Sequence, residues 1–266
     1  RRELSTRRDP PIREVIAAGV PGRLAALLRE GAVPAHVQRE AVLTLAKLSE
    51  GSTEEVAAVI SSGAGGALVG LLSSPGLQQL PELCGETLCA LSSFASDSTA
   101  IRDHLLQVGV IEALDGLYGA MQEAPWGPAP RLTVLRALTR LARVLCCGAP
   151  PPPPEEVDCM FDYFFQVVNE CEDPDMRSDA VSGLQHLLGS SPDREGGGHS
   201  LERLLAAGSP AELRGLAAQV GSTAPASQAP RFDENCPGAG NGGAPLHAVG
   251  KAPVVGLCGS PRVGGG

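Results

Sequence analysis

The sequence predicts an all-α fold, a solenoid of about four to five similar three-helix units followed by a disordered C-terminal tail. Apolar residues recur at helical spacing, i, i+3 and i+4, along most of residues 1–218. A glycine-centred apolar pattern also returns at a period in the forties, which is typical of helical repeat proteins. Aromatic residues make up only 3% of the chain, and this scarcity favours helices packed through Leu, Ala and Val.

The glycine-centred pattern marks a junction between a short helix and a longer one. The pattern begins with two aliphatic residues, and a glycine follows after two residues of any type. A leucine then follows after four residues of any type, and a second leucine after two more. The glycines are Gly19, Gly63, Gly109 and Gly208. The intervals are 44, 46 and 99 residues, so the last one leaves room for a further unit. Glycine supplies the left-handed conformation that ends a helix, and Pro21 suits the first turn of the next helix.

A third helix is predicted to complete each unit. Four segments have apolar residues at helical spacing and end in a polar turn: "HVQREAVLTLAKLS" from His36, "LCGETLCALSSFAS" from Leu83, "RLTVLRALTRLARVLCC" from Arg131 and "MRSDAVSGLQHLLG" from Met176. A single unit cannot bury its own apolar face, whereas stacked units bury one another's. We therefore expect a short helix, a post-glycine helix and this third helix to repeat along the chain.

One unit is predicted to be irregular. Its junction falls near residues 155–168, "EEVDCMFDYFFQVV", an apolar helix without the glycine, and "GAPPPPPEE" at residues 148–156 replaces the usual turn. We interpret the proline run as a stiff connector between two helices; a ligand for SH3-type domains is the alternative interpretation.

The solenoid is predicted to end at residue 218. From about Gly221 the chain is rich in Gly, Pro, Ala and Ser, and such a segment cannot bury enough apolar area to offset its ordering entropy. Residues 219–266 are therefore predicted to be a disordered tail.

Composition argues against several classes of function. The net charge of -9 disfavours nucleic-acid binding, because such proteins need basic surface to displace phosphate counterions. No apolar run approaches about 18 residues, so no membrane partner is expected. The chain starts at Arg1 rather than Met and shows no signal peptide, so we expect an intracellular protein that is incomplete at its start.

No motif predicts an enzyme, a metal site or a cofactor. The cysteines form no C-x-x-C pair and the histidines are scattered, so reduced core thiols are expected rather than zinc ligands. The stretch "GAGNGG" at residues 238–243 satisfies G-x-G-x-x-G, but no strand is predicted before it and no helix after it. No serine stands in the G-x-S-x-G elbow of a hydrolase.

Several stretches resemble the armadillo repeats of the importin α family, the adaptors that carry basic nuclear localisation signals to the nuclear pore machinery. They are "LSTRRDPPIREVIAAGVPGRLAALL" from Leu4, "EGSTEEVAAVISSGAGGALVGLLSS" from Glu50, "SDSTAIRD" from Ser96 and "EDPDMRSDAV" from Glu172. The irregular proline-rich unit is also similar to the family's fourth unit. The resemblance covers residues 1–218 and implies a right-handed armadillo solenoid with about four of the family's ten repeats. The family's importin-β-binding arm has no counterpart in this sequence, so importin β is implied as a partner of full-length relatives only.

The resemblance also implies a concave groove for basic peptides. The family lines this groove with a tryptophan and, one helical turn later, an asparagine on each third helix, and the i, i+4 spacing puts both on one face. Aligned on "EGSTEE", those positions hold other residues in every unit: Leu43 and Lys47, Cys89 and Ser93, Arg140 and Val144, and Ser182 and His186. The flat faces that would stack on lysine and arginine stems are therefore lost, and Lys47 and Arg140 add positive charge.

Three groove positions are retained by resemblance. Asp97 matches the family's carboxylate for the most deeply bound lysine, Gly51 matches the glycine whose carbonyl helps to coordinate that lysine, and Glu86 falls at a polar groove position. Val56 replaces a threonine of the same lysine pocket. From residue type alone, a helix-end or turn aspartate is the alternative interpretation of Asp97.

The function that the resemblance implies is a nuclear import adaptor, present in cytoplasm and nucleus, that recognises basic nuclear localisation signals. The lost tryptophans and asparagines favour an alternative, a non-transport armadillo scaffold that binds another extended peptide or a protein partner. An inactive, barely folded remnant is a third hypothesis, because a solenoid cut after four repeats exposes the apolar face of its last unit.

Overall fold

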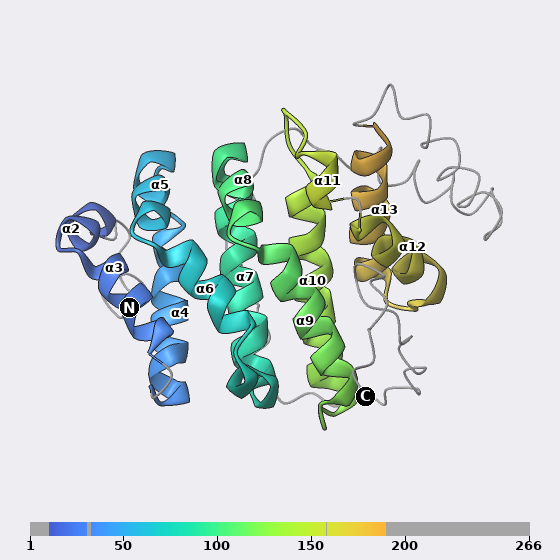
Figure 1. Ribbon diagram of the computed structural model, residues 1–266, viewed down its shortest axis with the longest axis horizontal. Helices are drawn as coiled ribbons and strands as arrows, with labels where there is room; N and C mark the ends of the chain where they lie inside the picture. The colour runs from blue at the N-terminus through green and yellow to red at the C-terminus, as the bar shows by residue number, and fades with distance from the viewer. Residues whose placement is uncertain (1–10, 31–32, 158, 190–266) are drawn as a thin grey trace, which may run out of the picture.

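A computed structural model describes residues 11–30, 33–157 and 159–189. These residues fold into four successive three-helix units, which follow one another along the long axis in Figure 1. The units are α2 (Ile12–Ala17), α3 (Val20–Arg29) and α4 (Ala35–Leu48); α5 (Thr53–Ser61), α6 (Ala64–Leu72) and α7 (Pro81–Asp97); α8 (Thr99–Gln107), α9 (Val110–Glu123) and α10 (Pro128–Cys146); and α11 (Pro154–Val157), α12 (Met160–Glu170) and α13 (Pro174–Gly189). A short 3-10 helix, η1 (Pro75–Gln79), precedes α7. The all-α prediction is confirmed for this part of the chain, which contains no strand.

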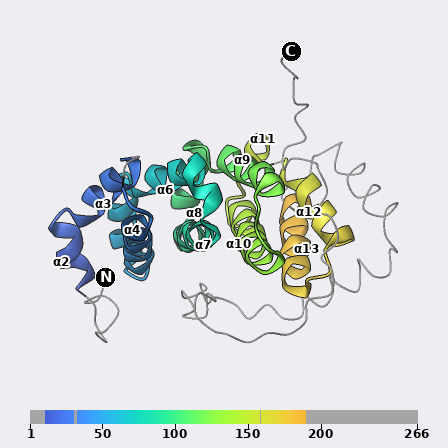
Figure 2. The ribbon, with the colours of Figure 1, turned by 90° about the horizontal axis from the view of Figure 1, so that it is seen from below.

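The third helices of the units form a ladder. α4 packs on α7, α7 on α10 and α10 on α13, and we call these four the ladder helices. The second helices α3, α6 and α9 pack on one another in the same order and make a second layer, which is seen above the ladder in Figure 2. Each unit therefore contacts chiefly its neighbours, as expected of a solenoid.

The predicted glycine junctions are confirmed where the structure describes them. Gly19, Gly63 and Gly109 have φ angles of 72°, 90° and 83°, and each stands directly before the second helix of its unit. Pro21 lies in the first turn of α3. The fourth junction, at Gly208, and the predicted tail, residues 219–266, lie outside the described residues.

A pair of substitutions in α9 tests the role of these junctions. Gly109→Ala should lower the free energy of unfolding by about 1 kcal/mol, because an L-residue is strained at its φ of 83°. Gly116→Ala, in the exposed middle of the same helix where an added Cβ meets nothing within 4 Å, should raise it by about 0.5–1 kcal/mol. Urea denaturation of both variants measures the two effects; a shift of equal sign would contradict the junction account.

One continuous core lies between the two layers. The ladder helices contribute fully buried residues from every unit, among them Leu45, Leu91, Leu141 and Ala180. Helices α12 and α13 approach each other closely at Gly183, where a Cβ would lie 2.5 Å from the ring of the buried Phe164. The small size of the glycine therefore sets the packing of the last unit.

Buried hydroxyl groups in the ladder find partners inside the core. Thr87 donates to the carbonyl of Leu83 at 2.7 Å, one helical turn back. Thr139 lies 2.9 Å from the carbonyl of Leu135 and 2.6 Å from the hydroxyl of the buried Tyr163 in α12. This last contact ties the third unit to the fourth, where α12 begins without a glycine junction.

The proline run connects α10 to α11, as the sequence predicts, and a buried arginine holds it in place. Arg102 in α8 is 1% exposed, and its guanidinium donates to the carbonyl of Cys147 at 2.6 Å and to that of Pro150 at 3.0 Å. The carboxylate of Asp103 lies 2.7 Å from the same guanidinium. The last carbonyls of a helix lack donors within that helix, and prolines have no amide hydrogen to offer. Arg102 supplies hydrogen-bond donors to a carbonyl at the end of α10 and to one in the proline run.

Candidate functional site

The side of the ladder helices that faces solvent is the candidate site, and we call it the ladder face. Neighbouring ladder helices cover the flanks of each helix and the second layer covers its back, so one stripe stays accessible. Most of the positions aligned with the importin α groove keep part of their surface accessible, and Val144 is the exception among them. Two of these positions are exposed, Arg140 and His186. Five are half-buried, namely Leu43, Lys47, Cys89, Ser93 and Ser182, and the side chain of Val144 is buried, with 7% of its surface exposed.

Asp97 lies on this face at the end of α7, eight residues after Cys89 and four after Ser93. Its Oδ2 atom is buried and has no hydrogen-bond partner among the described residues. Burial raises the pKa of the Asp97 carboxyl, and the side chain of Thr53 offsets this effect only in part. The cap of the following helix is Ser98, whose hydroxyl accepts from the amide of Ile101 at 3.4 Å. Asp97 is therefore a helix-end residue that does not act as the cap of α8.

The turn between α4 and α5 lies beside Asp97, since Thr53 begins α5. A capping box fixes this turn: the amide of Ser52 donates to the Glu55 carboxylate at 2.9 Å, and the amide of Glu55 donates to the Ser52 hydroxyl at 3.4 Å. A Cβ at Gly51 would lie 2.8 Å from the Glu55 carboxylate, so the turn needs glycine there. The structure thus places Gly51 two residues from Thr53, in the neighbourhood of Asp97. Val56 is fully buried in the core.

Glu86 is engaged within the protein. The guanidinium of Arg39 in α4 donates from Nε to both carboxylate oxygens, at 2.9 and 3.0 Å, and from Nη2 to Oε1 at 2.6 Å. This bidentate contact joins α4 to α7 across the ladder face. It also raises the pKa of Arg39 through the hydrogen bond to Glu86. A ligand cation would have to compete with Arg39 for this carboxylate.

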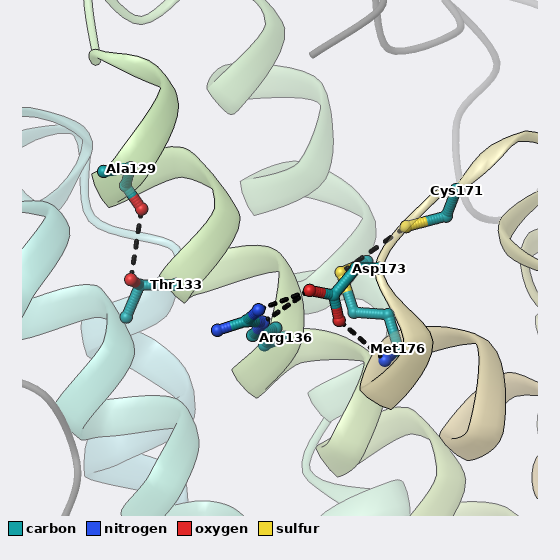
Figure 3. A network of polar contacts seen from close by, with 6 residues as sticks. All are labelled: Ala129, Thr133, Arg136, Cys171, Asp173 and Met176. Carbon is teal, nitrogen blue, oxygen red and sulfur yellow. Dashed lines mark hydrogen bonds and ion pairs between the residues drawn. The ribbon is translucent and has the colours of Figure 1, made fainter. Parts of the chain in front are cut away.

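Two more arginines join α10 to the last ladder helix. Arg136 pairs with Asp173, which also accepts from the amide of Met176 at 3.0 Å, as Figure 3 shows. Burial acts to raise the pKa of Asp173, but the hydrogen bonds from Arg136 and from backbone amides, together with the charge of Arg136, outweigh burial and lower that pKa. Two turns further along α10, Nε of Arg143 lies 2.8 Å from Oδ1 of Asp179. This contact is an ion pair, because the Nε–H is not aligned for a hydrogen bond.

The cations predicted to oppose a basic ligand differ in their surroundings. Lys47 is 19% exposed at its side chain and pairs with Glu50 at 2.8 Å. Arg140 is exposed and makes no hydrogen bond or ion pair with another described residue, although its charge acts to lower the pKa of Asp179, which burial raises. Burial and the charge of Arg143 both lower the pKa of His186. On the α10 and α13 part of the ladder face, Arg140 is thus an exposed cation whose charge is not matched by an ion pair with another described residue.

Sequence reasoning did not find the arginine cross-links. A signal was present, because Arg39 and Arg136 each stand four residues before a position aligned with a groove tryptophan, Leu43 and Arg140. Residues at that spacing share a helix face. Their partners come from other helices, and no periodicity within one helix identifies them.

Other chemistry finds little support in the described part of the chain. No group of three or more His, Cys, Asp or Glu residues there could hold a metal ion. Cys84 and Cys146 are buried in the core, and burial raises the pKa of the Cys84 thiol to about 12. No single helix in this part is long and apolar enough to cross a membrane; α5 and α6 together pass that test only as a pair bent by 63°.

Comparison with known proteins shows that the chain is similar to importin α subunits. No family model matches it. Importin subunit alpha-1b of Oryza sativa subsp. japonica is 31% identical over 194 residues, which are 73% of this chain and 34% of that relative. The chain is a divergent relative of importin α. Importin subunit alpha-6 of Arabidopsis thaliana is 29% identical over 187 residues, 70% of this chain and 32% of that relative. This importin α relative thus spans about one third of the length of the proteins it matches.

Solved structures confirm the armadillo fold. The designed armadillo repeat protein YIII(Dq)4CqI superposes with a TM-score of 0.58 at 16% sequence identity, over 82% of this chain and 87% of the designed one. A second designed armadillo repeat protein, solved in complex with the peptide (KR)4, superposes with a TM-score of 0.56 at 17% identity, over 83% and 88% of the two chains. The importin α relative is therefore an armadillo-repeat α-solenoid.

Proposed function

We propose that the ladder face binds an extended peptide that carries a lysine, and that the protein is a nuclear import adaptor for basic localisation signals. The observation that carries this proposal is the unpartnered Oδ2 of Asp97. A buried carboxylate oxygen without a partner is costly, and an ammonium group is the ligand that would compensate for it. Gly51, in the adjoining turn, offers a backbone carbonyl as a second acceptor.

The other carboxylates explain why such binding would be weak. Glu86, Asp173 and Asp179 are each paired with an arginine from the preceding ladder helix. A basic peptide therefore gains a net attraction at Asp97 but has to displace an internal ion pair elsewhere. Since no tryptophan stands on the ladder face, roughly 0.5–2 kcal/mol per cation contact is also missing.

Fluorescence anisotropy with a lysine-rich peptide tests the proposal directly. At physiological salt we expect micromolar binding to the full chain and at least a tenfold loss of affinity in Asp97→Asn. Glu112→Gln, on the exposed side of α9 in the second layer, removes the same charge away from the ladder face and should bind like the unaltered protein. Equal affinities of all three proteins would leave only the general attraction of an acidic surface and would refute the proposal.

The same substitution should have the opposite effect on stability. Because the pKa of Asp97 is raised on folding, the folded state holds this proton more tightly than the unfolded state, and ionisation costs stability as the pH rises through that pKa. An uncharged amide has no ionisation cost, so Asp97→Asn should leave the free energy of unfolding at pH 7 unchanged or raise it by up to about 1 kcal/mol. Urea denaturation at pH 7 measures this; a clear loss of stability would make Asp97 a structural residue.

The adaptor role in cells rests on the same binding. We propose that the protein is present in cytoplasm and nucleus and carries cargo with a lysine-containing signal, with importin β as a partner of its full-length relatives. Nuclear accumulation of a fluorescent cargo in permeabilised cells, supplied with importin β and with the full chain fused to the importin-β-binding arm of a full-length relative, tests this role. Accumulation that is lost in Asp97→Asn supports it, and cargo that stays outside the nucleus contradicts it.

A non-transport scaffold is the second candidate function. Arg140 favours it, because an exposed arginine stands where a basic peptide would need a stacking surface. Tight capture of a peptide without lysine or arginine, unaffected by Asp97→Asn, would establish this function in place of the first.

A further inference from the structure

The ladder face changes its charge character along its length. Around α5 and α7 it offers Oδ2 of Asp97, the carboxylate oxygen that has no hydrogen-bond partner among the described residues. Along α10 it offers three arginines, Arg136, Arg140 and Arg143, at the spacing i, i+4 and i+7, which places them on one side of that helix. Arg136 and Arg143 form ion pairs with aspartates of the last unit. Arg140, between them, is exposed and forms no ion pair with another described residue.

We propose that the ladder face selects a peptide of mixed charge, in which one lysine reaches Asp97 and an acidic residue reaches Arg140. This inference rests on the proposed peptide-binding function and names the class of peptide. Arg140 has no hydrogen bond or ion pair with the described residues, so a ligand carboxylate binds it without displacing an internal partner. A guanidinium in such a position binds a carboxylate through two parallel hydrogen bonds.

The distance between the two positions sets the spacing of the ligand. Asp97 lies eight residues beyond Cys89, the α7 counterpart of Arg140, which is about 12 Å along a helix axis. Packed helices such as α7 and α10 stand roughly 9 Å apart. Together these give about 15 Å, which an extended peptide covers with four to five residues at about 3.3 Å each. The lysine and the acidic residue should therefore stand that far apart in the ligand.

The neighbouring arginines reinforce the selection. Arg136 and Arg143 lie one turn on either side of Arg140, and each is paired with a single aspartate. A second lysine of the ligand at this end would meet the charge of Arg140, and Asp173 and Asp179 are already paired with arginines. A peptide with lysines throughout is therefore a poorer ligand than one whose far end is acidic.

A set of matched peptides tests the inference on the full chain. Fluorescent peptides with one lysine carry glutamate, glutamine or a second lysine five residues away, on either side of the first. Anisotropy at physiological salt should show the glutamate peptide binding about fivefold tighter than the glutamine peptide, and the second-lysine peptide binding weakest. Arg140→Glu should reverse this order, whereas Arg23→Glu, the same charge change on the exposed side of α3, should leave it intact.

The outcomes separate the inference from the proposed function. If the two-lysine peptide binds as well as the glutamate peptide, and Arg140→Glu changes neither, the charge selection is wrong while lysine binding stands. If no peptide binds and Asp97→Asn has no effect, the proposed function fails and the inference fails with it. Circular dichroism of Arg140→Glu confirms folding, which an exposed residue should not disturb.

Discussion

Replacing Arg102 with methionine is expected to lower the free energy of unfolding by about 3 kcal/mol, the largest single effect that the structure implies. The guanidinium is 1% exposed and serves the carbonyls of Cys147 and Pro150. Methionine keeps much of the volume but leaves both carbonyls without their donor, and removing one partner of a buried charge-assisted hydrogen bond costs about 1.5–3 kcal/mol. The side chain of Asp103 also loses its ion pair.

A matched control separates burial from bonding in this experiment. Arg29 donates to the carbonyl of Gly63 at 2.8 Å, a contact of the same chemistry between neighbouring units, but it is exposed. Arg29→Met should therefore cost less than about 1 kcal/mol. Urea denaturation followed by circular dichroism measures both values. Equal losses in the two variants would show that Arg102 does not hold the proline run in the way described.

The second large effect is a gain of affinity. Restoring tryptophan and asparagine on two ladder helices, with Leu43→Trp, Lys47→Asn, Cys89→Trp and Ser93→Asn together, should raise affinity for a basic peptide at least tenfold. The four residues already lie half-buried on the ladder face, so new side chains there would meet the ligand. Two stacking surfaces contribute roughly 0.5–2 kcal/mol each, and removing the Lys47 charge adds to this.

The contributions in that experiment are separable. Lys47→Asn alone removes one positive charge and should give a smaller gain that fades with salt, because exposed charges are screened. The tryptophans should give a gain that persists at high salt. Anisotropy titrations at two ionic strengths measure both, and an unchanged affinity of the fourfold variant would mean that the ladder face is not where the peptide binds.

Much of the fold follows from local sequence patterns. The junctions at Gly19, Gly63 and Gly109 were predictable because a left-handed residue followed by an apolar helix is a local property. The four ladder helices were predictable from helical periodicity, and their observed bounds differ from the predicted segments only at the ends. The 3-10 helix η1 before α7 was not foreseen, since its sequence lacks any periodic signal.

The candidate site was predictable only in outline. Alignment assigned Asp97 and Gly51 to one lysine pocket, and this assignment stays a prediction. The lack of a hydrogen-bond partner at Oδ2 of Asp97 depends on how α5 packs against α7, which no alignment shows. Glu86 was expected to be open to a ligand, and its pairing with Arg39 from another helix could not be read from either helix alone. Val144, aligned with a groove asparagine, is buried, because a valine there is free to turn into the core.

Internal ion pairs connect the ladder helices of this chain. They link successive ladder helices through charge, at Arg39 and Glu86, Arg136 and Asp173, and Arg143 and Asp179. Exposed pairs of this kind contribute about 0–1 kcal/mol each to stability, so their main consequence is for binding. In the proposed binding mode they reduce the negative charge that is available to a cationic ligand, and Asp97 is then the expected anchor of its lysine.

Hydrogen exchange of the full chain with and without a saturating lysine-containing peptide tests the central claim most directly. We predict that the peptide slows exchange in the turn at residues 49–53 and in the last two turns of α7, around Ser93 and Asp97, and leaves α3, α6 and α9 unchanged. Protection of the second layer, or a bound peptide that protects neither the turn nor the end of α7, would contradict the assignment of the ladder face as the binding site.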